Sequence, residues 1–136
     1  EPELFGAAVA QVPFVDALNT MLDPTLPLTV TEWEEWGDPA TSEAIYREMR
    51  AYTPYENVQG APYPAVLATA GLNDPRVGYW EPAKWVSRMR DITTGSEPIL
   101  LHTNMEAGHG GASGRFERLK EVAMIWGYLL HRAGLS

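Results

Sequence analysis

Short apolar runs divide the chain and are typical of buried β-strands. They lie at residues 6–12 (GAAVAQV), 65–70 (AVLATA) and 98–103 (PILLHT). Each run is apolar at consecutive positions and is bounded by glycine or proline, which is the pattern of a strand that is buried on both faces. These runs therefore predict strands of a parallel sheet.

Amphipathic segments between and after these runs predict helices. The helical pattern covers residues 41–52, 80–90 and 115–132. Thr41 or Ser42 can cap the first of these helices, and Glu43 lies in its first turn, where the helix dipole favours a carboxylate. In the last helix, apolar residues recur at spacings of three and four: Phe116, Leu119, Val122, Ala123, Trp126, Leu129 and Leu130.

The segment between the first strand and the first long helix has less regular patterning. Residues 14–22 predict a loop or a short helix, and residues 23–39 (DPTLPLTVTEWEEWGDP) predict a surface excursion because they are rich in proline and carboxylates. The predicted elements otherwise alternate strand, helix, strand, helix, strand, helix. This order predicts the α/β class, with a parallel sheet, helices on both faces and right-handed crossovers.

Two residues with catalytic chemistry follow the second and third predicted strands. Asp74 comes soon after residues 65–70, and His109 follows residues 98–103 within the glycine-rich stretch NMEAGHGGASGR. Functional side chains of open α/β sheets gather at the carboxyl ends of the strands, so we expect these two to meet. Imidazole can act as a base near neutral pH, and a carboxylate can hold it in one tautomer. Asp before His also matches the chain order Ser, Asp, His of an α/β-hydrolase triad.

Each of these residues also has a simpler interpretation. Asp74 lies in Asn-Asp-Pro, a common turn sequence, and His109 could be a solvated histidine in a glycine loop. Their occurrence together favours catalysis, but no serine of the chain lies in a G-x-S-x-G turn. We therefore expect the nucleophile upstream of residue 1. The abrupt apolar start of the chain likewise predicts a C-terminal portion of a longer protein.

Composition narrows the classes of partner and cofactor. The net charge of -8 argues against nucleic acid or an anionic membrane surface as the main partner. No run approaches the roughly 18 apolar residues of a membrane span. The chain has no cysteine, and His102, His109 and His131 lack the spacing of metal ligands, so we expect no metal or other cofactor. Instead, His102 is expected to pack within its strand.

Two long stretches carry a family resemblance. GLNDPRVGYWEPAKWV and NMEAGHGGASGRFERL closely resemble the C-terminal catalytic region of the prolyl oligopeptidase family of serine peptidases, in particular its oligopeptidase B group. PELFGAAVAQVPFVD and TEWEEWGDP extend the likeness over nearly the whole chain. The resemblance implies an α/β-hydrolase domain capped by a β-propeller that lies upstream. It also implies a cytoplasmic enzyme with Asp74 as triad acid, His109 as triad base and an upstream serine.

The same resemblance implies cleavage after Arg or Lys in short peptides. Glu32 and Glu34 match the acidic pair that binds the basic side chain, Phe14 would lie against its aliphatic stem, and Arg76 would bind a substrate carbonyl or carboxylate. The chemistry fits, because a carboxylate pairs with a guanidinium and an indole face stacks on a cation. Which of Glu32, Glu34 and Glu35 makes the contact stays open, and a solvated acidic turn is the alternative.

Other functions fit the same fold. The chain could belong to an α/β hydrolase of another substrate class, such as an esterase or an acylaminoacyl or prolyl peptidase, or it could be a catalytically silent binding domain. If Glu32 and Glu34 point away from the cleft beside His109, the specificity for basic residues fails. We expect the chain to be inactive by itself, because only residual catalysis survives loss of a nucleophile. We also expect it to need the N-terminal remainder of its protein, which would cover an exposed sheet edge.

Overall fold

The computed structural model of the chain describes residues 2–135. In chain order, its elements are η1 (Pro2–Leu4), β1 (Ala7–Gln11), α1 (Ala17–Met21), α2 (Thr29–Trp36), α3 (Glu43–Tyr52), β2 (Ala65–Gly71), α4 (Trp80–Ile92), β3 (Ile99–Asn104) and α5 (Arg115–Arg132). The strands of this described part form one parallel sheet in the order β1-β2-β3. This confirms the predicted sheet. No helix among these residues is long and apolar enough to cross a membrane.

The register of the sheet brings the carboxyl ends of β2 and β3 together. Gly71, the last residue of β2, pairs with Asn104, the last residue of β3. The amide of Leu72 then donates to the carbonyl oxygen of Asn104 at 2.9 Å, which extends the contact beyond the strands. The loops that follow the two strands therefore leave from the same edge of the sheet.

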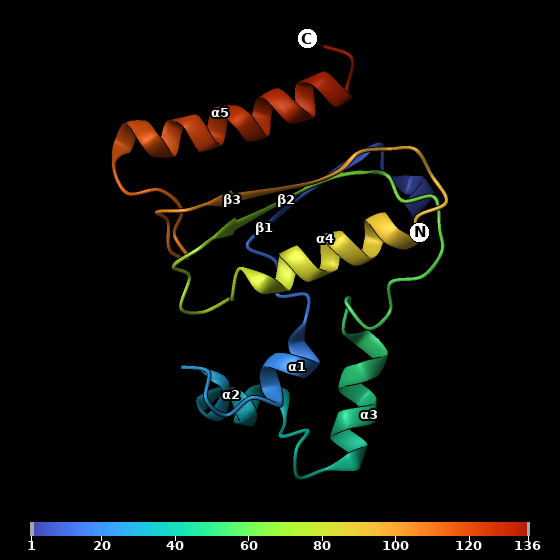
Figure 1. Cartoon of the computed structure of the whole chain (residues 1–136), viewed down its shortest axis with the longest axis vertical. Helices are drawn as coiled ribbons and strands as arrows, with labels where there is room; N and C mark the ends of the chain where they lie inside the picture. Colours follow the sequence, from blue (N-terminus) through green and yellow to red (C-terminus); the bar gives the residue numbers. More distant parts are fainter. Residues whose placement is uncertain (1, 136) are drawn as a thin grey trace.

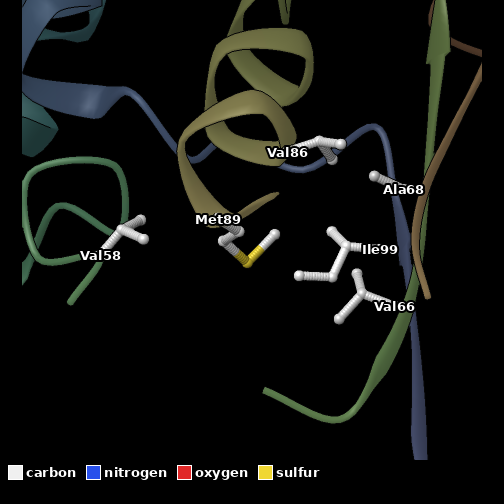
Figure 2. Packing of buried hydrophobic residues seen from close by; sticks show 6 residues of the cluster. All are labelled: Val58, Val66, Ala68, Val86, Met89 and Ile99. Carbon is white, nitrogen blue, oxygen red and sulfur yellow. The ribbon is translucent and has the colours of Figure 1, made fainter. Parts of the chain in front are cut away.

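Helices cover both faces of the sheet, as the alternating pattern predicts. Helix α4 lies on one face and α5 on the other (Figure 1). An apolar core fills the space between α4 and the strands, where Val86 and Met89 of the helix meet Val66, Ala68 and Ile99 of the sheet (Figure 2). Full burial of such a side chain stabilises a fold by about 1.5–3 kcal/mol, so this layer anchors α4 to the sheet.

Helices α1, α2 and α3 form a second apolar cluster on the side of α4 away from α5 (Figure 1). Residues 23–39 lie mostly at the surface, as predicted, but their second half forms a helix, α2, that the sequence pattern did not predict. The prolines lie before and after this helix and not within it. Trp33 and Trp36 share one face of α2 and pack into the cluster, where the rings of Phe14 and Trp36 meet edge to face at 5.4 Å. Packing of these rings therefore stabilises a helix in a segment that is rich in polar residues.

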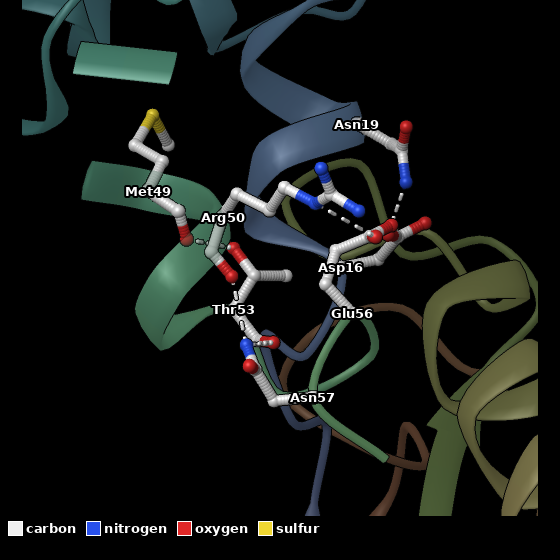
Figure 3. Close-up of polar contacts among 7 residues, drawn as sticks. All are labelled: Asp16, Asn19, Met49, Arg50, Thr53, Glu56 and Asn57. Carbon is white, nitrogen blue, oxygen red and sulfur yellow. Dashed lines mark hydrogen bonds and ion pairs between the residues drawn. The ribbon is translucent and has the colours of Figure 1, made fainter. Parts of the chain in front are cut away.

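Side chains cap both ends of α3. The Ser42 hydroxyl accepts a hydrogen bond from an amide of the first turn at 3.4 Å, which confirms one of the two predicted caps. At the other end, Thr53 Oγ1 donates to the carbonyl of Met49, and Asn57 Nδ2 donates to the carbonyl of Arg50, each at 2.7 Å (Figure 3). The Arg50 carbonyl would otherwise lack a helical partner, because residue 54 is proline, whereas the Met49 carbonyl also accepts the backbone amide of Thr53 at 2.9 Å.

Helix α5 has the predicted bounds but buries a different stripe from the one its sequence indicates. Most predicted apolar positions are exposed, and Phe116 is 76% exposed. The half-buried residues recur at helical spacing on another side: Glu121, Met124, Ile125, Tyr128, Leu129 and Arg132. The helix is apolar on more than one side, so periodicity alone does not decide which side meets the sheet. The exposed stripe is an apolar surface of the described chain.

Candidate active site

Asp74 and His109 form a hydrogen-bonded pair at the edge where β2 and β3 end. The distance from His109 Nδ1 to Asp74 Oδ2 is 2.9 Å. The Asp74 side chain is fully buried, whereas the His109 side chain is 36% exposed. A buried carboxylate thus holds one ring nitrogen and leaves Nε2 as the nitrogen that can face a nucleophile. The structure therefore brings together the two residues that the sequence places at neighbouring strand ends.

The second carboxylate oxygen of Asp74 is held by its own loop. Asp74 Oδ1 accepts hydrogen bonds from the backbone amides of Arg76 at 2.8 Å and Val77 at 3.1 Å. This is the turn geometry that Asn-Asp-Pro favours. The turn interpretation and the catalytic interpretation are therefore compatible, because each one uses a different oxygen of the same carboxylate.

Gly71 allows the two loops to approach each other closely. A Cβ atom on Gly71 would lie 2.6 Å from the carbonyl oxygen of Ala107 and 2.7 Å from that of Gly108. The amide of Asn73 also donates to the Ala107 carbonyl at 3.0 Å. Any side chain at position 71 would push the histidine loop away from the Asp74 loop.

His109 stands at the tip of a tight turn. Gly108 and Gly111 form an antiparallel bridge, and the amide of Gly111 donates to the carbonyl of Gly108 at 3.2 Å. Gly111 has φ of +81°, a conformation that side chains strongly disfavour. The glycines around His109 therefore serve to reverse the chain directly beneath the imidazole.

Glu121, which no sequence pattern indicated, holds this loop at both ends through hydrogen bonds. Its Oε1 accepts from Asn104 Nδ2 at 2.6 Å, and its Oε2 accepts from the amide of Ala112 at 3.1 Å. Asn104 Oδ1 in turn accepts from the amides of Glu106 and Ala107. No signal in the sequence distinguishes Glu121, because the side of α5 that meets the sheet is not the one its apolar periodicity indicates.

Two cavities adjoin the Asp74 loop. One, of about 210 Å³, lies between that loop and α1 and α2, and its lining includes Asp74, Arg76 and Glu32. The other, of about 240 Å³, is lined by Phe14, Leu28, Glu32, Glu35, Trp36, Arg76 and Val77. Glu32 and Arg76 line both cavities, so the acidic segment of α2 faces the loop that carries Asp74.

The second cavity thus brings Phe14, Glu32 and Arg76 together. Glu34 and Glu35 are both exposed, but Glu35 lines the second cavity and Glu34 lines neither. The helical form of α2 explains this difference, because residues three apart share a helix face and residues two apart do not. His102 lies half-buried within β3. Among residues 2–135, no group of His, Cys, Asp and Glu side chains is arranged to hold a metal ion.

Comparison with known proteins identifies the family. The family model described as the prolyl oligopeptidase family matches residues 1–136. The chain belongs to the prolyl oligopeptidase family. Within it, the chain is 51% identical to Protease 2 of Moraxella lacunata over 98% of the chain, and 47% identical to Dipeptidyl aminopeptidase BI of Pseudoxanthomonas mexicana over 99%.

A solved structure shows the same relationship in three dimensions. Oligopeptidase B from Leishmania major matches 97% of the chain with a TM-score of 0.94 and 46% sequence identity. This likeness confirms the predicted α/β-hydrolase fold and the predicted similarity to the oligopeptidase B group. The chain covers 18% of the Leishmania protein, 19% of Protease 2 and 18% of Dipeptidyl aminopeptidase BI. It therefore spans about a fifth of the length of these relatives.

Proposed function

We propose that the chain provides the acid and the base of a Ser-Asp-His triad in a serine peptidase. The observation that carries this proposal is the 2.9 Å hydrogen bond between the buried Asp74 carboxylate and His109 Nδ1. Its position at neighbouring strand ends, in the order Asp then His, matches the α/β-hydrolase arrangement. The proposed nucleophile is a serine in a G-x-S-x-G turn of the longer protein, upstream of this chain.

The geometry fits general acid–base catalysis by His109. In the proposed reaction, His109 Nε2 takes the serine hydroxyl proton while the serine oxygen bonds to the peptide carbonyl carbon. Asp74 holds Nδ1–H and stabilises the imidazolium that forms. His109 then gives the proton to the leaving amine as the C–N bond breaks, which leaves an acyl-enzyme. Water then attacks the acyl-enzyme carbonyl while His109 takes its proton, and the serine leaves with that proton as the carboxylic acid product is released.

The proposed substrates are short peptides with Arg or Lys before the cleaved bond. Glu32 lines the cavity that Phe14 and Trp36 also line, so a carboxylate and aromatic surface lie within one site. A guanidinium needs this combination, since the carboxylate pairs with its charge while an aromatic ring covers its flat face and stem. Glu35 is the second carboxylate of this cavity, and Arg76 is proposed to bind a substrate carbonyl or carboxylate.

The longer protein is proposed to include an N-terminal remainder with the nucleophile and a β-propeller cap. This remainder would cover the apolar stripe of α5, where Phe116 is 76% and Trp126 60% exposed. It would also pair with the outer edge of β1, which lies at one side of the described sheet. The chain alone is therefore proposed to be inactive and unstable. A cytoplasmic location stays a prediction from the family resemblance.

A matched set of peptides tests the proposed specificity on the full-length protein. The peptides differ only at the residue before the cleaved bond, which is Arg, Lys, citrulline or Pro. Citrulline has the length of Arg without its charge, so loss of a charge-assisted hydrogen bond should lower kcat/KM by about 10- to 100-fold relative to Arg. Equal cleavage of the Arg and citrulline peptides, or preference for Pro, would contradict the basic specificity. Turnover of esters without turnover of peptides would favour the esterase alternative.

A further inference from the structure

Glu81 is a buried carboxylate that the proposed mechanism does not use. It lies in the first turn of α4, directly after the loop that carries Asp74, and is 0% exposed. Its Oε2 accepts the backbone amide of Asp16 at 2.9 Å, and its Oε1 accepts the Thr20 hydroxyl at 2.7 Å. Asp16 lies at the N-terminal cap of α1, and Thr20 lies within this helix. The side chain therefore joins the Asp74 side of the site to the segment that precedes α2.

Further hydrogen bonds continue from α1 into α2. Thr29 Oγ1 donates to the carbonyl of Thr20 at 2.8 Å, and Trp33 Nε1 donates to the carbonyl of Met21 at 3.0 Å. Glu32 lies between these two donors on α2. Glu81 and Glu32 also line the same 210 Å³ cavity. A continuous set of hydrogen bonds thus leads from the first turn of α4 through α1 to α2, the helix that carries Glu32.

A second connection fixes the orientation of α1 against α4. The Asp16 carboxylate forms an ion pair with Lys84, which lies in α4 near Glu81. It also accepts a hydrogen bond from Asn19 Nδ2 at 2.6 Å (Figure 3). Two attachments between the same pair of helices restrict rotation as well as separation, so α1 cannot pivot freely about Glu81.

Stability alone does not require a carboxylate at this position. Burial raises the pKa of Glu81 above its ordinary value, and the hydrogen bonds from Thr20 and Asp16 offset this only in part. An apolar side chain of similar volume would avoid the cost of burying a charge, but it would leave the buried Asp16 amide and Thr20 hydroxyl without acceptors. A role in orienting the neighbouring helices gives a reason for the carboxylate that packing does not give.

We propose that Glu81 is a positioning residue for recognition of the basic side chain. Its two hydrogen bonds hold α1, and through α1 the Glu32-bearing helix α2, at the distance from the Asp74 loop that an Arg or Lys side chain requires. This inference rests on the proposed peptidase function and names a residue that controls its specificity without touching the substrate.

The test compares variants of the full-length protein at both ends of one contact. Glu81→Leu removes both acceptors, and Thr20→Val removes one donor while keeping the shape of the side chain. Glu81→Gln is the conservative variant, because its amide oxygen can accept from Asp16 while its NH₂ group donates to the Thr20 hydroxyl. Asp91→Asn is the matched control, since Asp91 is an exposed carboxylate on the same helix.

The readouts are the ratio of kcat/KM for Arg and citrulline peptides, and the rate of labelling by a fluorophosphonate, which reports on the triad alone. We expect Glu81→Leu to lower the ratio by about tenfold, which corresponds to one lost hydrogen bond to a charged group. Thr20→Val should lower the ratio less, and Glu81→Gln should retain most of it. The labelling rate should stay within about twofold throughout, and Asp91→Asn should change neither readout.

An unchanged ratio in folded Glu81→Leu and Thr20→Val would overturn the inference. A parallel fall in ratio and labelling rate would also overturn it, because a general structural defect would then explain both. If Glu81→Leu does not fold, the Arg to citrulline ratio of Thr20→Val decides whether the inference stands. The wild-type protein is measured first: an Arg to citrulline ratio near one would refute the proposed specificity and this inference together, whereas failure of the inference alone leaves the wild-type ratio high.

Discussion

Gly71 pairs with Asn104 at the carboxyl ends of β2 and β3. Because of this pairing, the Asp74 loop and the His109 loop begin at adjacent points. His109 Nδ1 then lies 2.9 Å from Asp74 Oδ2. The contact between Asp74 and His109 is therefore a consequence of strand register. This pair, the loops that hold it and the carboxylates around it can each be tested by substitution in the full-length protein.

Substitution of either proposed triad residue should abolish most peptide hydrolysis. Asp74→Asn and His109→Ala should each lower kcat by about 10⁴-fold or more, with a smaller change in KM. The Asn variant fails because its NH₂ group cannot hold the Nδ1–H tautomer of His109. Steady-state kinetics on an Arg peptide measures this loss. A variant that keeps a tenth of wild-type kcat with normal folding would rule out the assigned role.

Substitution of Glu32 should remove the preference for basic residues. Glu32→Gln should lower kcat/KM for an Arg peptide by about 10- to 100-fold and leave a citrulline peptide nearly unchanged. Glu34→Gln should have a much smaller effect, because Glu34 lines neither cavity beside the Asp74 loop. Glu48→Gln, at an exposed carboxylate of α3, controls for the change in net charge. Equal effects of Glu32→Gln and Glu34→Gln would show that the cavity does not decide specificity.

Addition of one methyl group at position 71 should impair catalysis. Gly71→Ala places a Cβ atom 2.6 Å from the Ala107 carbonyl oxygen, so the histidine loop must move. A displacement of about 1 Å of a catalytic group can cost about 100-fold in rate, and we expect a fall in kcat of that order. Gly127→Ala is the control, because a Cβ atom there meets nothing within 4 Å. Normal kcat in Gly71→Ala would mean that the loops can separate without consequence.

Glu121 should control kcat through the histidine loop. In Glu121→Gln one oxygen is replaced by NH₂, so a donor faces either Asn104 Nδ2 or the Ala112 amide, which are themselves donors. We expect kcat to fall by about tenfold or more while KM changes little. Glu117→Gln is the comparison, because its ion pair with Lys120 is exposed and contributes little. Equal kcat in the two variants would contradict a positioning role for Glu121.

Stability should depend on pH through Glu81. Burial raises the pKa of this carboxyl above its ordinary value of 4.5, so between 4.5 and the raised value the folded state binds more protons than the unfolded state. The wild-type free energy of unfolding should therefore fall relative to that of Glu81→Gln as pH rises above 4.5, and the difference should level off above the raised pKa. Urea unfolding of both proteins across this range measures it. A difference that stays constant with pH would contradict the raised pKa.

The strands and the Asp–His pair could be predicted because their signals are local and the topology is simple. Apolar runs such as residues 65–70 identify strands by themselves, and parallel strands converge at their carboxyl ends. Two residues placed after neighbouring strands must therefore lie near each other, whatever the intervening helix contains. This explains why Asp74 and His109 were identified without any contact information.

The supporting carboxylates could not be predicted because their burial depends on tertiary packing. Glu81 lies in the first turn of a helix, where a carboxylate usually serves the helix dipole at the surface, yet it is fully buried against α1. Glu121 occurs among other charged residues of α5, and only the side of the helix that meets the sheet distinguishes it from Glu117. Helix α2 was missed for a related reason, since packing of Trp33 and Trp36 against α1 and α3 stabilises a helix in a segment whose composition indicates only a surface excursion.

Labelling of the full-length protein with a fluorophosphonate, followed by peptide mapping, tests the central claim most directly. The account predicts one adduct, on a serine upstream of this chain, with a labelling rate that falls by about 10³-fold or more in His109→Ala because the serine then lacks its base. An adduct on a serine within this chain, or a labelling rate that His109→Ala leaves unchanged, would contradict the assignment of Asp74 and His109 as the triad acid and base.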